Sequence, residues 1–423
     1  MADLIETVKQ GMGMKKSLFL ALTLAACIAQ AEVRKLAESE RMEVLELAKW
    51  LWDNPELSGK EFEAAKRQIA YLREKGFAVT EKYVGLATAY RAEFSSGTGN
   101  PTFAFCTEYD ALPKVGHACG HNLNCGAALS AALIVQRELK ATGANGRVVL
   151  FGCPAEETFG GKIDMANAGA LDDVDAIMMC HANPGMRPSA DFGYAGLRSV
   201  KVTYRGVGAS PVARWASPKI RNPLDAQTLL YEAIALRRHY TPKEVAVAGT
   251  IVQAGERSNM VPNETVASYT VRSQDLVLLD EWAVELKRMA EGAALMTGTE
   301  VEVEIGGCKQ PTNPCFSLSD AYLDAMAEQG LVGVKRHKKV LEFAATDFGD
   351  FSQLRPAIHM HFPIFADELC HSKGFAAACN TPSAYESMFK SGAAMAATAL
   401  KYLNDTAFRE KVNAEFQVSK AEK

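Results

Sequence analysis

The chain has 423 residues, nearly half of them hydrophobic, which is too long for one ordinary core and predicts two domains. The net charge is −4, with acidic and basic residues mixed along the chain, and this argues against nucleic acid as a partner. The ten cysteines are scattered singly through a large chain, which excludes the framework of a small disulfide-rich domain. Free thiols are therefore expected, one or two of which are available to bind metal.

The first 31 residues differ in pattern from the rest. Lys15 and Lys16 precede an apolar run at 17–26, and Ala29-Gln30-Ala31 follows it. This order predicts a secretory signal peptide and therefore an exported or periplasmic protein. A lipoprotein-type site ending at Cys27, and a buried N-terminal helix in a cytoplasmic protein, are the alternatives. The apolar run is too short to cross a bilayer, and no other stretch predicts a membrane span.

Helix and strand patterns alternate after this segment. Helical spacing of apolar residues runs from 32 to 78, with a break at Asn54-Pro55, and a small-residue helix is predicted at 123–142. Short apolar strands are predicted at 101–106, 147–152 and 175–180. The alternation predicts an α/β catalytic domain whose parallel-containing sheet has helices on both faces.

The pattern changes near residue 195. A half-exposed strand, with alternating polar and apolar residues, is predicted at 197–204. Helix, strand, strand, helix and strand follow at 224–239, 246–254, 265–272, 278–297 and 300–305. This β-α-β-β-α-β order predicts a ferredoxin-like α+β domain at 196–309. The helix-rich pattern then returns, so the small domain is inserted between the two parts of the catalytic domain, 32–195 and 310–423.

The first candidate for chemistry is the pair Cys119 and His121. We expect it in an extended segment after a strand, where residues two apart point the same way. The carboxyl ends of strands are where sites gather in open α/β sheets. A thiolate and an imidazole on one side suit half of a zinc or manganese site. The alternative is a buried thiol near a hydrogen-bonded histidine.

The second candidate is the pair Glu156 and Glu157, directly after the strand at 147–152. Adjacent carboxylates in extended chain point in opposite directions. Glu157 could then bind metal while Glu156, unligated, acts as general base toward an activated water. The alternative is an exposed acidic turn, which is less expected between an apolar strand and two glycines.

Two further histidines are ambiguous when taken alone. His181 ends the strand at 175–180, and His371 lies in the C-terminal part. Five ligands suit two metal ions if the thiolate bridges, giving Cys-His-Glu at one ion and Cys-His-His at the other. The predicted ligands are Cys119, His121, Glu157, His181 and His371.

The motifs resemble those of the M20 family of metallopeptidases over residues 40–403. The similar branch contains aminoacylases, auxin-conjugate hydrolases, aminobenzoyl-glutamate hydrolases and dipeptidases that act on basic β-alanyl dipeptides. The motifs are Leu51-Trp52-Asp53-Asn54-Pro55-Glu56-Leu57, Glu108-Tyr109-Asp110-Ala111-Leu112-Pro113, Gly116-His117-Ala118-Cys119-Gly120-His121-Asn122, Pro154-Ala155-Glu156-Glu157 with Gly160-Gly161-Lys162, and Thr346-Asp347-Phe348-Gly349-Asp350.

The resemblance implies a catalytic domain that carries an inserted lid, through which the chain forms a homodimer. It implies two divalent metal ions held by the five ligands, with Cys119 bridging and Glu156 as the base. It also implies that Asn259 and Arg272 of the lid bind the polar end of the substrate. An Arg side chain suits a carboxylate because its planar fork donates two parallel hydrogen bonds.

The chain departs from the family at Ser210, in the stretch Gly206-Val207-Gly208-Ala209-Ser210-Pro211. Lids of the family carry a histidine at this position, which reaches the partner subunit's site and supports the oxyanion. Losing an oxyanion donor costs about 10²–10³ in turnover. A serine hydroxyl is shorter and neutral, so it would donate a weaker hydrogen bond.

We therefore expect a two-metal amidohydrolase that cleaves the amide bond of a small N-acyl amino acid or dipeptide-like substrate. Zinc or manganese would activate the water, with Glu156 as general base. One alternative is a metal-dependent enzyme with an altered reaction, amide formation or an unusual substrate, because Ser210 replaces the histidine. The other is a non-catalytic metal-binding or ligand-binding homologue, against which the spare carboxylate of Glu156 argues.

Overall fold

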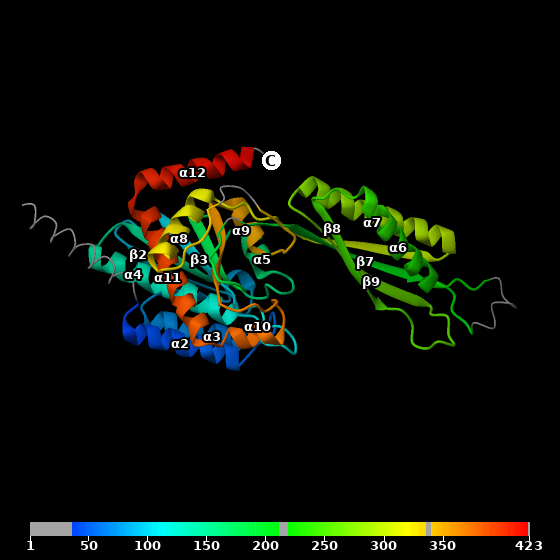
Figure 1. The fold of residues 1–423 in the computed structure, drawn as a ribbon, viewed down its shortest axis with the longest axis horizontal. Helices are drawn as coiled ribbons and strands as arrows, with labels where there is room; N and C mark the ends of the chain where they lie inside the picture. Colours follow the sequence, from blue (N-terminus) through cyan, green and yellow to red (C-terminus); the bar gives the residue numbers. More distant parts are fainter. Residues whose placement is uncertain (1–35, 191, 211–218, 336–339, 422–423) are drawn as a thin grey trace, which may run out of the picture.

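The computed structural model describes residues 36–190, 192–210, 219–335 and 340–421, so the proposed signal segment lies outside it. Two sheets, each with its own helices, stand apart in the molecule (Figure 1). A third, two-stranded sheet pairs β6 (Phe192–Tyr194) in parallel with β11 (Val340–Glu342). Among the helices of the described residues, none combines the length and the hydropathy needed to cross a membrane.

The larger sheet has six strands in the order β1-β2-β4-β3-β5-β12. β4, β3, β5 and β12 pair with one another in parallel. At the other edge, β1 pairs with β2 and β2 pairs with β4 in antiparallel fashion. The strands are β1 (Ala78–Glu81), β2 (Tyr90–Ser96), β3 (Thr102–Thr107), β4 (Gly146–Gly152), β5 (Ala176–Asn183) and β12 (Ala357–Pro363). The prediction of a parallel-containing α/β sheet is confirmed.

Three of these strands were absent from the sequence prediction. β1 is four residues long and mostly exposed, so it carries no apolar run. β2 holds polar residues at an antiparallel edge, and β12 interrupts its apolar run with His359 and His361. All seven residues of β12 are nevertheless buried, because the strand lies beside β5 and under helices.

Helices cover both faces of the six-stranded sheet. Successive residues of β3 point to opposite faces, so Phe103 and Phe105 join one core and Ala104 and Cys106 join the other. The first core contains α2 (Glu38–Asp53), α3 (Phe62–Glu74), α4 (His121–Thr142), α8 (Phe316–Glu328) and α11 (Pro382–Asn404). The second contains α5 (Gly161–Asn167) and α9 (Phe348–Leu354). The remaining helices of this part are α10 (Lys373–Ala378), α12 (Thr406–Ala421) and the short 3₁₀ helix η1 (Tyr83–Gly85).

The smaller sheet has four antiparallel strands in the order β10-β7-β9-β8, and residues 196–309 form it together with two helices. Its elements follow one another as strand, helix, strand, strand, helix and strand. They are β7 (Gly196–Arg205), α6 (Pro223–Arg237) with η3 (Arg238–Tyr240), β8 (Val245–Gln253), β9 (Glu264–Ser273), α7 (Leu276–Thr297) and β10 (Glu300–Lys309). We call this part the lid.

The lid has a core of its own between its sheet and its helices. Val200, Val202 and Tyr204 of β7 pack with Leu230 of α6 and Leu286 of α7, all nearly inaccessible to solvent. Asn222 begins α6 by accepting a hydrogen bond from the backbone of Leu224, and Asp275 caps α7 in the same manner. The lid extends away from the six-stranded sheet (Figure 1), so only its near end can reach residues of that sheet.

Candidate metal centre and active site

The first two candidate ligands lie on either side of a sharp turn. Cys119 is in the turn, and His121 is the first residue of α4 rather than part of an extended segment as expected. Gly120 between them has a φ of 75°, a left-handed conformation that favours glycine. A Cβ atom at Gly120 would lie 2.6 Å from the Cβ of Ala182. A close approach of the turn to β5, and not the two-residue period of a strand, therefore brings the thiol and the imidazole together.

Asp110 orients His121. Its carboxylate Oδ1 lies 2.9 Å from Nδ1 of His121, while its Oδ2 accepts hydrogen bonds from Ser58 Oγ and from the backbone N–H of Glu157. Nε2 of His121 is buried and has no hydrogen-bond partner. Oε2 of the buried Glu108 lies 3.4 Å from the same nitrogen. A histidine whose Nδ1 is held by a carboxylate and whose Nε2 makes no hydrogen bond has the arrangement of a metal ligand.

The two glutamates lie in a turn after β4, which is a correction to the extended chain that we expected. Ala155 precedes them with a φ of 61°, and its backbone N–H donates to the buried carboxylate of Glu61 at 2.9 Å. The turn brings both carboxylates within 4.8 Å of His121 but gives them otherwise different neighbours. Glu157 lies among Cys119 and His371, while Glu156 lies with a buried group of acidic residues described below.

His181 and His371 come from distant parts of the chain. His181 lies near the end of β5, with its Nε2 3.3 Å from Sγ of Cys119. His371 has a φ of 66° and its backbone N–H donates to the carbonyl oxygen of Ala118 at 2.7 Å. Its Nε2 lies 3.5 Å from Oε1 of Glu157. The left-handed backbone and the link to Ala118 direct His371 to the site.

The five predicted ligands are brought together in two groups that share Cys119. In each group the ligand atoms lie within 4.8 Å of one another. The groups are Cys119, His121 and His181, and Cys119, Glu157 and His371.

At two of the candidate ligands, His181 and Glu157, the favoured protonation state suits a metal. At His121 burial lowers the pKa, but the charges of Cys119 and Asp110 outweigh burial and raise it overall, which favours the protonated imidazole. Burial, with the charge of His121, lowers the pKa of His181 to about 3, which leaves the imidazole neutral. Burial raises the pKa of Glu157, but hydrogen bonding to His371 and the charges of the two histidines lower it overall, so the carboxylate is ionised. Neutral imidazole and ionised carboxylate are the forms that bind divalent cations. Nε2 of His121 and Oε1 of Glu157 are buried without a hydrogen bond, and each lies near an oppositely charged group, Glu108 and His371 respectively, which fits the same role.

Glu156 borders a fully buried ion-pair network. Lys162 Nζ donates to Oε1 of Glu108 at 2.6 Å and to Oδ1 of Asp347 at 2.5 Å. All three side chains are inaccessible to solvent. Burial raises the pKa of Glu156 to about 8, and the charges of Glu108 and Asp347 add to the effect. Such a carboxyl is poised to accept and to return a proton near neutral pH.

Glu156 and most of the candidate ligands line one pocket of about 620 Å³. It lies between the carboxyl ends of the six-stranded sheet and the near end of the lid. Arg272, near the end of β9, lines it. Four of the candidate ligands line it with Glu156: Cys119, Glu157, His181 and His371. Its walls also include Glu108, Asn183, Tyr194, Leu197, Lys309, Thr346, His359 and His361. The pocket can therefore hold a small substrate beside the candidate metal centre.

Several pocket residues were missed from the sequence. His361 pairs with His181 across the parallel strands β12 and β5, and its Nε2 is hydrogen-bonded to the hydroxyl of Tyr194. His359 is 5% exposed and neither of its ring nitrogens has a hydrogen-bond partner. The spacing His359-Met360-His361 was the available signal, but without the strand assignment nothing placed it at the site. The sequence indicated Lys309 only as the last residue of the inserted domain, and not as a pocket residue.

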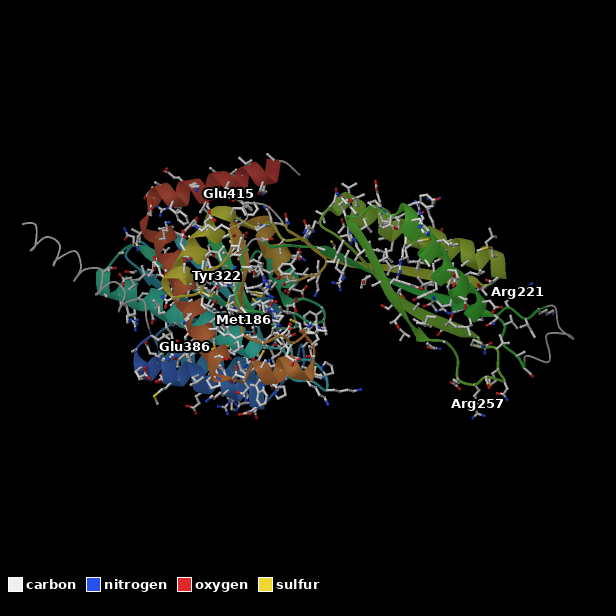
Figure 2. All side chains as sticks on the ribbon, in the orientation of Figure 1. Met186, Arg221, Arg257, Tyr322, Glu386 and Glu415 are labelled. Atoms are coloured by element: carbon white, nitrogen blue, oxygen red, sulfur yellow. The ribbon has the colours of Figure 1, made fainter. Side chains whose placement is uncertain are left out.

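The structure does not bring Ser210 and Asn259 to this pocket. Asn259 lies in an exposed turn next to Arg257, which Figure 2 places at the far end of the lid. Ser210 is exposed too, and its neighbour Ala209 accepts a hydrogen bond from Val261 in the same region. Between Asn259 and Arg272 runs most of β9, which spans about 26 Å from Glu264 to Arg272. Within one chain, Asn259 and Arg272 therefore cannot hold the same carboxylate.

Comparison with known proteins agrees with this architecture. The model of peptidase family M20/M25/M40 matches residues 104–377. The mouse (Mus musculus) Xaa-Arg dipeptidase is 31% identical over 92% of this chain and 93% of its own length. One of the subunits of p-aminobenzoyl-glutamate hydrolase from Escherichia coli (strain K12) is 31% identical over 69% of this chain and 64% of its own length.

The fold recurs in a solved structure. A Bacillus subtilis protein described as a dinuclear metal-binding peptidase of the M20 family superimposes with a TM-score of 0.67 and 21% sequence identity, covering 86% of this chain and 99% of that protein. The family match spans the turn of Cys119, both glutamates and both candidate ligand histidines of the later part. The chain belongs to peptidase family M20/M25/M40 and is a metal-dependent peptidase or amidohydrolase.

Proposed function

We propose that the protein hydrolyses the amide bond of a small N-acyl amino acid or dipeptide, with two divalent ions held by Cys119, His121, Glu157, His181 and His371. The observation that carries the proposal is the pair of ligand groups that share one thiol, with the carboxyl of Glu156 beside them. Thiolate and imidazole ligands favour zinc, and the mixed set with a carboxylate also accepts manganese.

When bound, the ions supply Lewis acidity at the scissile carbonyl. The protein's own residues perform the remaining steps. Glu156 accepts a proton from the attacking water, for which its raised pKa makes it suitable. It then returns that proton to the leaving amine, so one group serves first as base and then as acid. The Lys162 network fixes the charged surroundings in which Glu156 works.

The substrate's carboxylate is assigned to Arg272, whose guanidinium lines the pocket. A second copy of the chain would supply Asn259 and Ser210, which lie too far away in their own chain. This assignment requires a homodimer formed through the lid. Two features support it: β8 is an edge strand whose last six residues are exposed, and the lid carries exposed apolar side chains. These include Tyr231, Leu236, Tyr240, Val252, Met260, Leu295 and Met296.

The names of two relatives indicate the class of substrate. A dipeptidase and an aminobenzoyl-glutamate hydrolase both cleave an amide bond next to an amino acid, and this chain resembles them over most of its length. From these names our proposal adopts the type of bond that is cleaved, but not the side chains of the relatives' substrates.

The test is hydrolysis of a panel of N-acyl amino acids and dipeptides by the metal-loaded protein, alongside Glu156→Gln. We expect turnover by the wild type and a loss of at least about 10³-fold in the variant, since general base and acid catalysis are both removed. Metal content would be measured in both proteins, so that loss of the ions is not mistaken for loss of the base. Absence of hydrolysis by wild-type protein with two bound ions would contradict the proposal.

A second candidate is a metal-dependent reaction other than simple hydrolysis. It is favoured by Ser210, because a serine cannot replace a charged or long donor at the oxyanion. Product analysis with the same amides, run in the forward and the reverse direction, would separate amide formation from cleavage.

A further inference from the structure

Two cationic residues of the lid share one rung of its sheet. Leu197 on β7 pairs with Arg272 on β9 and with Lys309 on β10. Residues paired across antiparallel strands point to the same face. All three side chains line the pocket that holds the candidate ligands, and all three are half-buried. The lid therefore presents two cations to the pocket, one on each side of a leucine.

Neither cation has a carboxylate partner within the described part of the chain. The Arg272 guanidinium donates to the backbone carbonyl of Phe343 at 2.7 Å, and burial alone lowers its pKa. Lys309 Nζ donates to the backbone carbonyl of Glu156 at 2.9 Å. Most other cations of the lid sheet are paired, as Arg205 is with Glu264 and Glu302. Burial raises the pKa values of the Glu156 and Asp350 carboxyls, and the nearby charge of Lys309 opposes that rise. Among the residues that the structure describes, however, neither cation is neutralised by a direct ion pair, and half-buried cations of this kind favour an anionic ligand.

The two cations are spread apart rather than converging on one point. Neighbouring strands are about 4.8 Å apart, so the Cα atoms of Arg272 and Lys309, with Leu197 between them, are separated by about 10 Å. Their backbone acceptors also belong to different segments, the loop of Phe343 and the turn of Glu156. A single carboxylate would engage one of them fully, while two carboxylates a few bonds apart would engage both.

We propose that the preferred substrate is an N-acyl amino acid whose amino-acid part carries two carboxylates, held by Arg272 and Lys309. This inference rests on the proposed function and deepens it by naming the substrate class of the same site. Arg272 keeps the α-carboxylate, and Lys309 selects for a second carboxylate on the side chain. A basic side chain at this position would meet like charge.

The experiment compares N-acetyl-glutamate with N-acetyl-glutamine on the metal-loaded full chain. The two amides have nearly the same size and shape, so the ratio of their kcat/KM values reports one carboxylate. We expect the ratio to favour glutamate by at least about tenfold, the size of a charge-assisted hydrogen bond. Lys309→Met should bring the ratio close to one, mainly through KM, and Lys309→Arg should keep most of it.

The kcat/KM ratio also distinguishes two roles of Lys309: selecting the second carboxylate, and holding the backbone of the general base Glu156. If Lys309 acted only by holding the backbone of Glu156, Lys309→Met would slow both amides equally and leave the ratio unchanged, which would overturn the inference. A wild-type ratio near one, with either amide hydrolysed, would overturn it too while leaving the proposed hydrolase standing.

Failure of both amides to turn over would count against the proposed function, and binding would then decide the inference. Calorimetry with N-acetyl-glutamate and N-acetyl-glutamine would be run on metal-loaded wild type and Lys309→Met. Tighter binding of the glutamate compound, lost in the variant, would support the two-carboxylate site. Equal affinities in the wild type would overturn it.

Discussion

Oδ1 of Asp110 lies 2.9 Å from Nδ1 of His121, and the second oxygen of the same carboxylate accepts the backbone N–H of Glu157. One buried side chain thus orients a ligand from each of the two groups that share Cys119. The charge of His121 and these hydrogen bonds outweigh the effect of burial, which raises the pKa of Asp110, and hold it below its usual value.

Replacing Asp110 should therefore weaken metal binding. We expect Asp110→Ala to lower metal affinity about 10–100-fold, because both His121 and Glu157 lose their orienting acceptor. A competition titration against a chromophoric chelator would measure it. Ser58→Ala is the matched control, since it removes only a hydroxyl that bonds to Asp110. Equal affinity in Asp110→Ala and wild type would contradict this role.

The buried Lys162 should dominate local stability. Lys162→Met removes the buried cation that Glu108 and Asp347 share and leaves only His121 beside Glu108. Breaking such a network costs about 3–5 kcal/mol. Chemical denaturation of the metal-free protein would measure the change in free energy of unfolding. Lys66→Met is the control, because its pair with Glu63 is exposed. A loss below about 1 kcal/mol, the usual size of an exposed pair, would refute the prediction.

Asp350 should give the stability a pH dependence. Burial raises its pKa from 3.8 to about 6, so the folded state favours the protonated carboxyl. Its contribution is complete below pH 3.8 and is lost as the pH rises through 6. Asp350→Asn keeps an acceptor for the backbone N–H of Gln310 and removes the titration. Unfolding measured between about pH 4 and 7 should show the wild type losing stability relative to the variant. Parallel curves would exclude Asp350 as the source.

The lid edge should control oligomeric state. Val252 on β8 is 66% exposed, and a charge there should disrupt the proposed dimer. We expect Val252→Glu to sediment as a monomer and to lose most activity, since the partner's Asn259 no longer reaches the pocket. Val418→Glu is the control, because Val418 is also exposed but lies on α12, away from the lid. An active monomeric wild type would contradict the shared site.

Ser210→His restores a long donor at the tip of the lid. If the partner's lid closes the pocket, turnover should rise at least about tenfold, a part of the 10²–10³ that an oxyanion donor supplies. Ser210→Ala tests whether the hydroxyl itself contributes. The comparison requires kcat on one substrate that all three proteins hydrolyse. A histidine variant no faster than the wild type would indicate that the chain uses another donor.

The sequence predicted the architecture where periodic patterns were strong. The apolar strands at β3, β4 and β5 and the whole strand and helix order of the lid follow from local patterns. β12 was missed because His359 and His361 interrupt its apolar run, and only its burial between β5 and helices makes it a strand. Its assignment depends on contacts with residues far away in the sequence.

In the candidate site, too, some features follow from local sequence patterns and others depend on the folded structure. Motif spacing suggested the ligands, but the turn at Gly120 and the left-handed Ala155 and His371 bring them together. Local patterns do not reveal such backbone conformations at alanine or histidine, which rarely adopt them. The separation of Asn259 from Arg272 likewise follows from the length and direction of β9, which motif spacing did not show.

The hydrogen bond from the backbone N–H of His371 to the carbonyl oxygen of Ala118 ties the last candidate ligand to the neighbour of the first, Cys119. Between Cys119 and His371 in the chain lie three further candidate ligands, His121, Glu157 and His181, and the entire lid. On the ribosome, the early ligands leave the exit tunnel long before His371 is made. The nascent chain can thus fold much of its first core with an incomplete set of metal donors. We therefore expect full affinity for both ions only near the end of synthesis, once His371 has been made.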